Sequence, residues 1–369
     1  MPEKSPLHQL DDHGQSVWID FLSRELLETG ELERKLRDDA ITGVTSNPTI
    51  FQKAISQGDA YDDQLRECLE RLDDAKEIYL HLTHDDIAEA CDLLRPVWDA
   101  GHGRDGYVSW EVDPNLAYDQ AATIEEARRL HDWIDKPNLY VKIPATEPGL
   151  GAIEEMIAAG KSINVTLIFS LDRHREVMEA YIRGIERLVE AGGDPRPVSS
   201  VASFFVSRVD TETDKRLDAI SGHDELKGRL AVANAKLAYQ NWREVFSGER
   251  WAALEAKGAS KQWCLWASTS TKNPAYRDVL YVEELIGPQT VNTMPQETIE
   301  AFQDHGEVAL NLERDLDGAR RLFDELAAAG IDVDDVTRVL EEEGVQKFTD
   351  SFEELLEGIR AKRGELVSA

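Results

Sequence analysis

Short apolar runs alternate along the chain with longer stretches in which apolar residues recur every three or four positions. Short runs rich in β-branched and aromatic residues are typical of buried strands, whereas the longer periodicity is typical of amphipathic helices. This alternation indicates βα units arranged around a parallel sheet. Eight runs qualify as strands, which is the number that closes a (β/α)8 barrel. They cover residues 16–21, 41–45, 107–111, 139–143, 163–168, 198–205, 262–267 and 289–293.

Amphipathic stretches between these runs predict the helices. The stretch after Ser170 is a clear case, because serine is a preferred N-cap residue and apolar spacing follows it. The predicted helices cover residues 22–37, 85–98, 150–159, 171–191 and 223–246.

The last part of the chain, residues 296–363, predicts two or three helices that are divided at Gly330 and Gly344 and pack outside the barrel. No linker, fixed-period repeat or low-complexity tract interrupts the sequence. We therefore expect one domain over residues 1–369. It is an α/β fold, a TIM barrel with a core at about 16–294 and additional N- and C-terminal helices, the latter at about 296–365.

Charge and composition limit the partners. Acidic residues outnumber basic ones by 72 to 41, which gives a formal net charge of -31. Such a surface repels nucleic acid and anionic membranes, so neither is expected as a partner. It also repels phosphorylated ligands at long range, and a phosphate site must therefore gather cations of its own.

The sequence favours a cytoplasmic location. No apolar stretch is long enough to cross a membrane, and the first residues lack the apolar run of a signal peptide. Three cysteines, Cys68, Cys91 and Cys264, lie far apart and show no CxxC spacing. This usage predicts reduced, mostly buried thiols.

Polar residues stand near the carboxyl ends of the predicted strands, within or just beyond otherwise apolar runs. In a parallel barrel, the active site lies at this end of the strands, and core packing does not explain polar side chains there. The residues in question are Asp20, Asn47, Glu111, Lys142, Asn164, Thr166, Ser203 and Ser268.

Lys142 is the most informative of these residues, because it lies in a strand that should be buried on both faces, residues 139–144 (LYVKIP). Burying an ammonium group is costly, so burial favours the neutral amine. The neutral amine is the form that attacks a carbonyl, which makes a desolvated lysine a natural Schiff-base nucleophile. The alternative is a structural ion pair with Asp or Glu inside the barrel. For an isolated strand lysine, this alternative is favoured.

Two carboxylates change that balance. Asp20 and Glu111 each end a predicted strand, and Lys142 lies on the next strand after Glu111. Aldol cleavage needs a base for a hydroxyl proton and an acid/base group for the carbinolamine, and two carboxylates can supply both. Each alone could instead pair with Lys142 or cap a helix. Together with the lysine, they make catalysis the better explanation.

Amide and hydroxyl groups at the same strand ends suit a polyol substrate. Asn164 and Thr166 are spaced by two and therefore share one face of their strand. Asn47 follows another strand and precedes Pro48; taken alone, it could equally well cap the loop backbone.

Two further patterns are discounted. Residues 101–106 (GHGRDG) fit GxGxxG, but they follow a helix and precede a strand, the reverse of the dinucleotide-binding context, so we expect a loop. His81, His84 and Asp85 have the spacing of metal ligands on one helical face. A solvated helix end is favoured there, because no further ligand lies nearby in the sequence.

Four segments resemble the transaldolase family, in their order along the chain: residues 42–48 (TGVTSNP), 108–113 (VSWEVD), 141–146 (VKIPAT) and 163–170 (INVTLIFS). The resemblance runs from about residue 16 to 294 and falls on successive strands. The segments at 265–269 (LWAST) and 291–295 (VNTMP) are similar to the longer single-domain form common in actinobacteria.

The resemblance implies a (β/α)8 barrel that transfers a dihydroxyacetone unit between sugar phosphates in the non-oxidative pentose phosphate pathway. The donor would be sedoheptulose 7-phosphate or fructose 6-phosphate, and the acceptor glyceraldehyde 3-phosphate or erythrose 4-phosphate. The iminium formed with the lysine acts as the electron sink, so no metal or organic cofactor is required.

The resemblance also implies roles for single residues. Lys142 would form the Schiff base, and Asp20 would take the proton from the hydroxyl next to the breaking carbon–carbon bond. Glu111 and Thr166 would hold the water that shuttles protons. The hydroxyls of the dihydroxyacetone unit would be held by Asn47, Asn164 and Ser203.

At the phosphate end, the resemblance assigns Arg208 as the anchor, with Ser268 nearby. Lys272 is the nearest counterpart of a second arginine in the best-known members, and lysine binds phosphate as a point charge rather than bidentately. Much of the family has glycine before the anchoring arginine, where this chain has Ser207. Phe205 falls where the related fructose-6-phosphate aldolases have tyrosine, which favours transfer over simple cleavage.

Two other functions stay open at this point. The first is an aldolase of the same superfamily that releases a free aldehyde or ketone. The second is a non-catalytic acidic barrel that acts as a binding module, with Lys142 ion-paired and unreactive. The assembly is expected to be a monomer or a homodimer.

Overall fold

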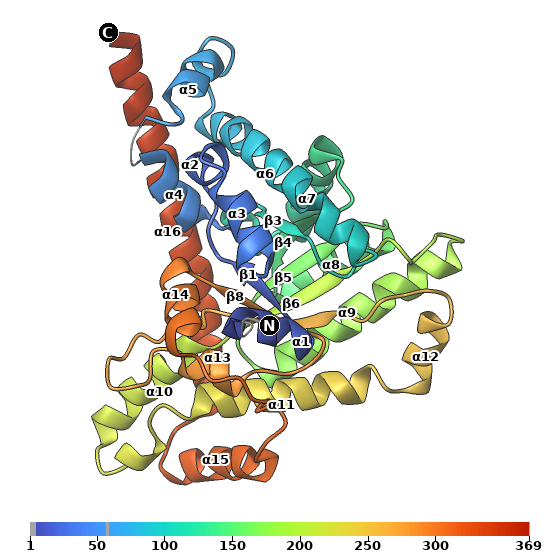
Figure 1. Cartoon of the computed structure of the whole chain (residues 1–369), viewed down its shortest axis with the longest axis vertical. Coiled ribbons are helices and arrows are strands. Elements are labelled where there is room, and N and C mark those ends of the chain that lie inside the picture. Colours follow the sequence, from blue (N-terminus) through green and yellow to red (C-terminus); the bar gives the residue numbers. More distant parts are fainter. Residues whose placement is uncertain (1–4, 57–58, 369) are drawn as a thin grey trace.

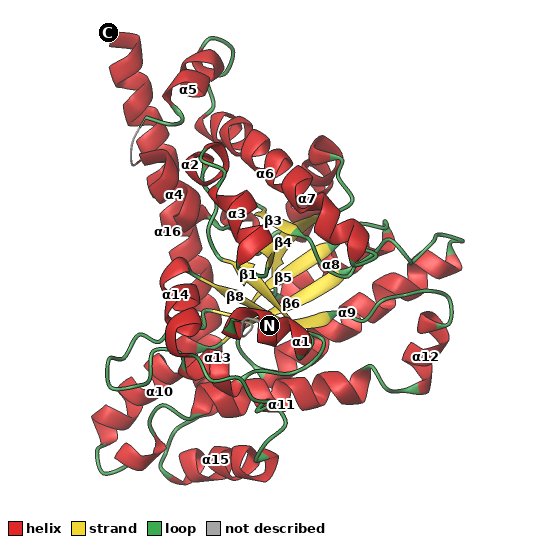
Figure 2. Cartoon of the chain, viewed as in Figure 1, coloured by secondary structure: helices red, strands yellow, loops and turns green. Residues whose placement is uncertain are grey.

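The computed structural model describes residues 5–56 and 59–368, and eight parallel strands in it form a closed barrel in chain order. Every strand predicted from the apolar runs is confirmed, and so is the TIM-barrel class. Figure 2 shows the strands gathered at the centre of a shell of helices. The strands are β1 (Gln15–Ile19), β2 (Ile41–Thr45), β3 (Val108–Glu111), β4 (Leu139–Pro144), β5 (Ile163–Ile168), β6 (Ser200–Phe205), β7 (Trp263–Ala267) and β8 (Thr290–Met294).

The helices surround this barrel (Figure 1). In the first half of the chain they are α1 (Pro6–Asp12), α2 (Arg24–Glu28), α3 (Glu31–Asp38), α4 (Pro48–Ser56), α5 (Asp62–Leu69), α6 (Ala75–Ala100), α7 (Gln120–Ile134), α8 (Glu147–Ala158) and α9 (Leu171–Glu190). In the second half they are α10 (Ser207–Ile220), α11 (Leu230–Val245), α12 (Glu249–Glu255), α13 (Leu280–Glu284), α14 (Gln296–His305), α15 (Leu316–Ala328) and α16 (Val333–Ser368).

The predicted helices are present in part or in full. The helix expected over residues 223–246 is wrong in its first part, where a 3-10 turn at Asp224–Leu226 precedes α11. The helix expected over residues 22–37 is divided at Gly30, which has a φ of 71° and lies between α2 and α3. The helix expected over 85–98 is part of α6, which begins ten residues earlier, after Asp74 accepts a hydrogen bond from the Glu77 amide. Helices α8 and α9 agree closely with the prediction.

Glycines also explain the C-terminal helices. Gly330, with a φ of 91°, ends the segment after α15, and the predicted division there is confirmed. The predicted division at Gly344 is wrong, because Gly344 lies inside α16. A Cβ atom at this glycine would meet Leu167 Cδ2 at 3.1 Å. The glycine therefore lets the helix approach β5 closely and does not end it.

Aromatic rings fill the lower part of the barrel, below the carboxyl ends of the strands. A Cβ at Gly43 would lie 2.5 Å from the ring of Trp18, so only glycine leaves room for the indole. The Trp18 ring lies 6.1 Å from that of Tyr140, which stacks on Tyr107 at 3.9 Å. Because Trp18 and Tyr140 each precede a predicted site residue by two positions, this layer is the floor beneath the site.

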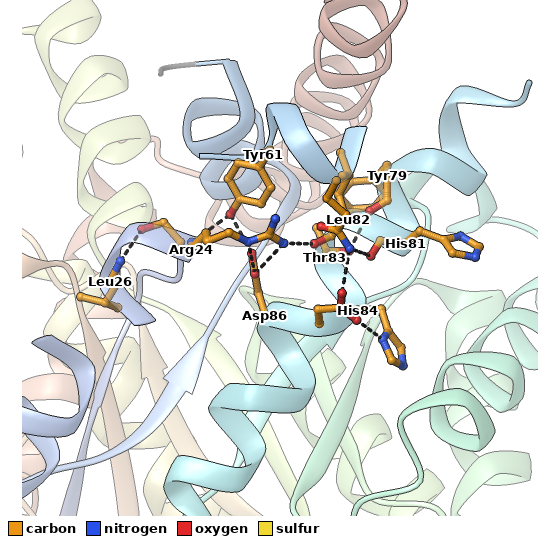
Figure 3. Close-up of polar contacts among 12 residues, drawn as sticks. Arg24, Leu26, Tyr61, Tyr79, His81, Leu82, Thr83, His84 and Asp86 are labelled. Carbon is orange, nitrogen blue, oxygen red and sulfur yellow. Dashed lines mark hydrogen bonds and ion pairs between the residues drawn. The ribbon is translucent and has the colours of Figure 1, made fainter. Parts of the chain in front are cut away.

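A buried polar network holds the segment that follows β1 (Figure 3). The Arg24 guanidinium donates to Asp86 Oδ1 at 2.9 and 3.0 Å and to the Leu82 carbonyl at 3.0 Å. The Tyr61 hydroxyl donates to Asp86 Oδ2 at 2.7 Å, and the Arg24 guanidinium lies 4.4 Å from the Tyr61 ring centroid. Burial raises the pKa of Asp86 to about 6. The network ties α2 to α5 and α6, and it fixes the chain four residues after Asp20.

None of the helices in the described ranges has both the length and the apolar character needed to span a membrane. Cys68, Cys91 and Cys264 are buried and free, as predicted.

Candidate active site

The predicted site residues meet at the carboxyl ends of the strands. A cavity of about 190 Å³ opens there, and eight of the ten residues line it. The other two, Glu111 and Asn164, are buried. Glu111 contacts Lys142, and Asn164 contacts Ser203 on β6 and Ser109 on β3. The eight lining residues are Asp20, Asn47, Lys142, Thr166, Ser203, Arg208, Ser268 and Lys272.

Lys142 is 5% exposed and lies beside Glu111 in the register of β3 and β4. Its Nζ donates to the Ser46 carbonyl at 3.1 Å and lies 3.5 Å from Glu111 Oε2. This carboxylate is the partner that a structural ion pair would need. The same amine lines the cavity, which a nucleophile requires and an ion pair does not.

Glu111 is 6% exposed, and burial raises the pKa of its carboxyl group to about 7. The nearby Lys142 ammonium opposes this rise in the pKa, and the Asp20 carboxylate adds to it. Glu111 is therefore poised to exchange a proton near neutral pH. Its Oε2 and the Thr166 hydroxyl have no hydrogen-bond partner among the described residues, so both can bind a substrate hydroxyl or a water.

Two threonines orient Asp20. Its Oδ1 accepts a hydrogen bond from Thr45 Oγ1 at 2.7 Å, and the Thr45 and Thr293 hydroxyls are also 2.7 Å apart. The Asp20 amide donates to the Met294 carbonyl at 2.9 Å. The carboxylate is thus held from β2 and β8. Thr45 was not among the predicted site residues, although it ends a strand as the others do.

Asn164 and Ser203 form a hydrogen-bonded pair at the cavity wall, which Ser203 lines. Ser203 Oγ donates to Asn164 Oδ1 at 2.7 Å, and Asn164 Nδ2 donates to Ser109 Oγ at 3.0 Å. Asn164 therefore orients Ser203 from the neighbouring strand. Asn47 Oδ1 accepts from the Ile50 amide at 3.1 Å. It caps the first turn of α4, as the alternative from the sequence held, and lines the cavity as well.

The loops after β6 and β7 form the cationic end of the cavity. Arg208 lies in the first turn of α10, where the helix dipole favours anions, and its guanidinium is 5.1 Å from the Phe205 ring centroid. Ser268 has a φ of 56°; its carbonyl accepts from the Ser207 amide at 3.0 Å, and the two hydroxyls are 2.9 Å apart. Ser207 thus binds the start of α10 to the loop after β7. Lys272 Nζ donates to Ser270 Oγ at 2.5 Å in the same loop.

The C-terminal helix is the part of the site that the sequence did not predict. The tail helices were expected to pack outside the barrel, but α16 passes over the barrel mouth and its Phe348 lines the cavity. Figure 1 shows α16 as a long rod beside α4, which it contacts. Gly344 on α16 marks its close approach to β5. No local pattern distinguishes Phe348 from the other apolar residues of this helix.

The two discounted patterns take no part in the site. Residues 101–106 form turns between α6 and β3, which confirms the predicted loop. The solvated helix end expected for His81 and His84 is wrong, because both lie inside α6 and pack against the Trp133 ring, with centroids 4.8 and 4.7 Å away. Figure 3 shows both imidazoles on α6, away from the Arg24 guanidinium. Among the residues that the structure describes, no group of three or more His, Cys, Asp and Glu side chains could hold a metal ion.

Comparisons with known proteins agree with this geometry. The profile of the Transaldolase/Fructose-6-phosphate aldolase family matches residues 17–359. The transaldolase of Frankia alni is 51% identical over 363 residues, which cover 98% of each chain. That of Mycolicibacterium smegmatis is 51% identical over 373 residues and the full length of both chains. The transaldolase of Acidothermus cellulolyticus is 52% identical over 368 residues, 97% of this chain and 99% of its own.

Proposed function

The chain belongs to the transaldolase/fructose-6-phosphate aldolase family, and we propose that it is a transaldolase whose nucleophile is Lys142. It transfers a dihydroxyacetone unit from sedoheptulose 7-phosphate or fructose 6-phosphate to glyceraldehyde 3-phosphate or erythrose 4-phosphate. One observation carries the assignment of the nucleophile. The buried Lys142 amine lines the cavity and has the Glu111 carboxylate 3.5 Å away.

The reaction begins with Schiff-base formation. The neutral Lys142 amine attacks the ketose carbonyl carbon, and the carbonyl oxygen takes a proton to give the carbinolamine. Glu111, with a pKa of about 7, then supplies a proton as this hydroxyl leaves as water. Thr166 and Glu111 have the free hydrogen-bonding atoms that can hold this water. The product is an iminium linked to Lys142.

Carbon–carbon cleavage follows. Asp20 removes the proton from the hydroxyl on the carbon next to the bond that breaks, and a carbonyl forms there. The electron pair of the broken bond passes into the iminium and leaves an enamine on Lys142. The shorter aldose phosphate departs. The iminium is the electron sink, so the reaction needs no metal or organic cofactor.

Transfer reverses these steps with a new aldose phosphate. The enamine attacks the acceptor aldehyde carbon, and the new hydroxyl receives its proton from Asp20. Water then attacks the iminium, and the longer ketose phosphate is released as the Lys142 amine is restored. Asp20 must hold its proton between the two half-reactions, and its bond from Thr45 keeps it oriented.

Substrate binding is divided between the two ends of the cavity. Ser203 and Asn47 bind the hydroxyls of the dihydroxyacetone unit, with Asn164 orienting Ser203. The phosphate lies at the other end. It is held by Arg208, Ser268 and Lys272.

Three broader features belong to the same proposal. The whole chain works as one domain, because α16 supplies part of the cavity wall that the barrel strands form. The enzyme acts in the cytoplasm as a monomer or a homodimer. Buried free thiols suit a reducing compartment.

Borohydride trapping tests the nucleophile. The enzyme is incubated with fructose 6-phosphate and reduced, and its peptides are mapped by mass spectrometry. We expect the adduct on Lys142 and none on Lys161, a surface lysine that pairs with Asp132. An unmodified Lys142 would refute both a transaldolase and an aldolase mechanism at this site.

A second assay separates transfer from cleavage. Erythrose 4-phosphate is added with fructose 6-phosphate, and sedoheptulose 7-phosphate is measured. Phe205 lines the cavity where a tyrosine would favour cleavage, so we expect product only with the acceptor present. Equal release of glyceraldehyde 3-phosphate without any acceptor would assign the chain to the aldolases of the family.

A further inference from the structure

A second cavity adjoins the first at the barrel mouth. It has a volume of about 650 Å³ and lies between α10, the loop after β7 and α16. Arg208, Ser268 and Lys272 line both cavities. These three residues therefore stand where the inner space that contains Lys142 meets the outer one. Lys347 of α16 lines the outer cavity beside them.

Three cations converge at this junction without ion pairs. Arg208, Lys272 and Lys347 form no ion pair with any residue in the described part of the chain. Several other cations of α16 are paired, for example Arg338 with Asp335 and Glu342. In a chain with a net charge of -31, it is the gathering of these three cations around one cavity that distinguishes this site.

Repulsion by neighbouring cations acts on Lys347. The positive charge of Arg208 is the largest cause of a lowered pKa at this lysine, followed by desolvation and then by Lys272 and Lys53. Cations held together in this way are destabilised in the free protein. A bound anion would relieve the repulsion, and a phosphate dianion can accept from several donors at once.

The packing of α16 on the barrel places Lys347 toward the barrel mouth. Gly344, Lys347 and Phe348 are spaced by three and four residues, so they share one face of the helix. Gly344 packs on Leu167 of β5, and Phe348 lines the inner cavity. Lys347 extends from the same face between these two contacts. The helix is therefore fixed against the barrel on both sides of the lysine.

Three carboxylates also line the outer cavity, and two of them have partners. Glu212 pairs with Lys215 and Arg216. Glu343 has no ion-pair partner among the described residues: burial lowers the pKa of Arg208, and the charges of Asp20 and then Glu343 only partly oppose this fall. Asp350, the other carboxylate with a partner, accepts a hydrogen bond from Gln346 at 2.7 Å. None of them neutralises Lys347.

We propose that Lys347 is a third cationic contact for the substrate phosphate, so that the C-terminal helix takes part in substrate recognition. The inference rests on the transaldolase function proposed above and deepens it at the phosphate end. Arg208 and Lys272 approach the phosphate from the barrel loops, and Lys347 approaches it from the helix that covers the mouth. The third cation raises selectivity for phosphorylated over unphosphorylated sugars.

Matched variants test the proposal. Lys347→Met removes the cation at the mouth, and Arg338→Met removes a cation from the same helix away from it. We expect Lys347→Met to lower kcat/KM for fructose 6-phosphate about tenfold through KM, the size of one charge-assisted contact. Activity with unphosphorylated fructose should not change. Lys347→Arg should retain most of the affinity, and Arg338→Met should behave as the parent enzyme.

A second measurement uses the unmodified enzyme and does not depend on folding of a variant. Lysines are acetylated with and without inorganic phosphate and mapped by mass spectrometry. We expect phosphate to protect Lys347 and to leave Lys161 equally reactive.

The outcomes distinguish the two proposals. Equal losses on both sugars in Lys347→Met, or no phosphate protection of Lys347, would overturn the role given to this lysine. Such a result would leave the transaldolase function intact as long as fructose 6-phosphate is trapped on Lys142. Failure of that trapping in the parent enzyme would instead overturn the function itself.

Discussion

Replacing Glu111 with glutamine tests whether burial raises the pKa of this carboxyl group into the range needed for proton transfer. The side chain is almost fully buried, and desolvation is the largest cause of the rise in its pKa from 4.5 to about 7. Glutamine has nearly the same shape but cannot ionise. Glu111→Gln therefore removes the buried titration while the packing around it changes little.

The raised pKa defines how stability changes with pH. Because the folded pKa lies above the unfolded one, the contribution of Glu111 is fully present below 4.5 and is lost as pH rises through about 7. Between pH 5 and pH 8, these two pKa values give a loss of about 2 to 3 kcal/mol in the free energy of unfolding. The parent enzyme loses this stability as pH rises, whereas Glu111→Gln does not.

Urea unfolding at pH 5, 6, 7 and 8 measures the effect. We expect the free energy of unfolding of the parent, relative to that of Glu111→Gln, to fall by about 2 to 3 kcal/mol over this pH range. Glu186→Gln is the control, since Arg250 lowers the pKa of Glu186 and the group stays ionised throughout. Turnover should fall in Glu111→Gln, with loss of the pH dependence near 7. Curves for the parent and variant that stay parallel from pH 5 to pH 8 would refute the reasoning.

Three other substitutions test the aromatic layer beneath the site, the orientation of Asp20, and the polar network around Asp86. Gly43→Ala forces a methyl group against the Trp18 ring and should destabilise the protein by about 1–3 kcal/mol in urea unfolding; unchanged stability would contradict the packing. Thr45→Val removes the bond to Asp20 and should lower kcat about tenfold to a hundredfold, while borohydride still traps the adduct; loss of trapping would show a wider disturbance. Tyr61→Phe leaves a buried carboxylate of α6 short of one donor and should cost about 1–2 kcal/mol of stability, with kcat unchanged. A Tyr61→Phe variant as stable as the parent would count against the network.

The barrel strands could be predicted from sequence because the signal that defines them is local. A strand buried on both faces must be apolar along its length, so the run itself marks the element. The ends of the helices were harder to predict from the sequence. Gly30 divides a regular apolar pattern through a left-handed backbone conformation, which periodicity does not record. At Gly344, the same residue type permits close packing inside a helix.

The site residues on strands could be predicted for a related reason. Polar side chains such as Lys142 and Glu111 interrupt apolar runs, and topology brings all strand ends to one place. What the sequence could not provide was their mutual arrangement. The bond from Thr45 to Asp20 and the capping role of Asn47 depend on side-chain directions in loops and on neighbouring strands.

The contribution of α16 could not be predicted, because it depends on where a helix more than two hundred residues after Glu111 packs. Lys347 and Phe348 lie in an ordinary amphipathic pattern, and nothing nearby in the sequence marks them. Their importance comes from the contact of Gly344 with Leu167, which brings this turn of the helix over the mouth. An acidic protein that binds phosphate must collect cations from whatever elements reach the site. In the phosphate site that we propose, the barrel loops supply Arg208 and Lys272, and the last helix supplies Lys347 to the same cavity.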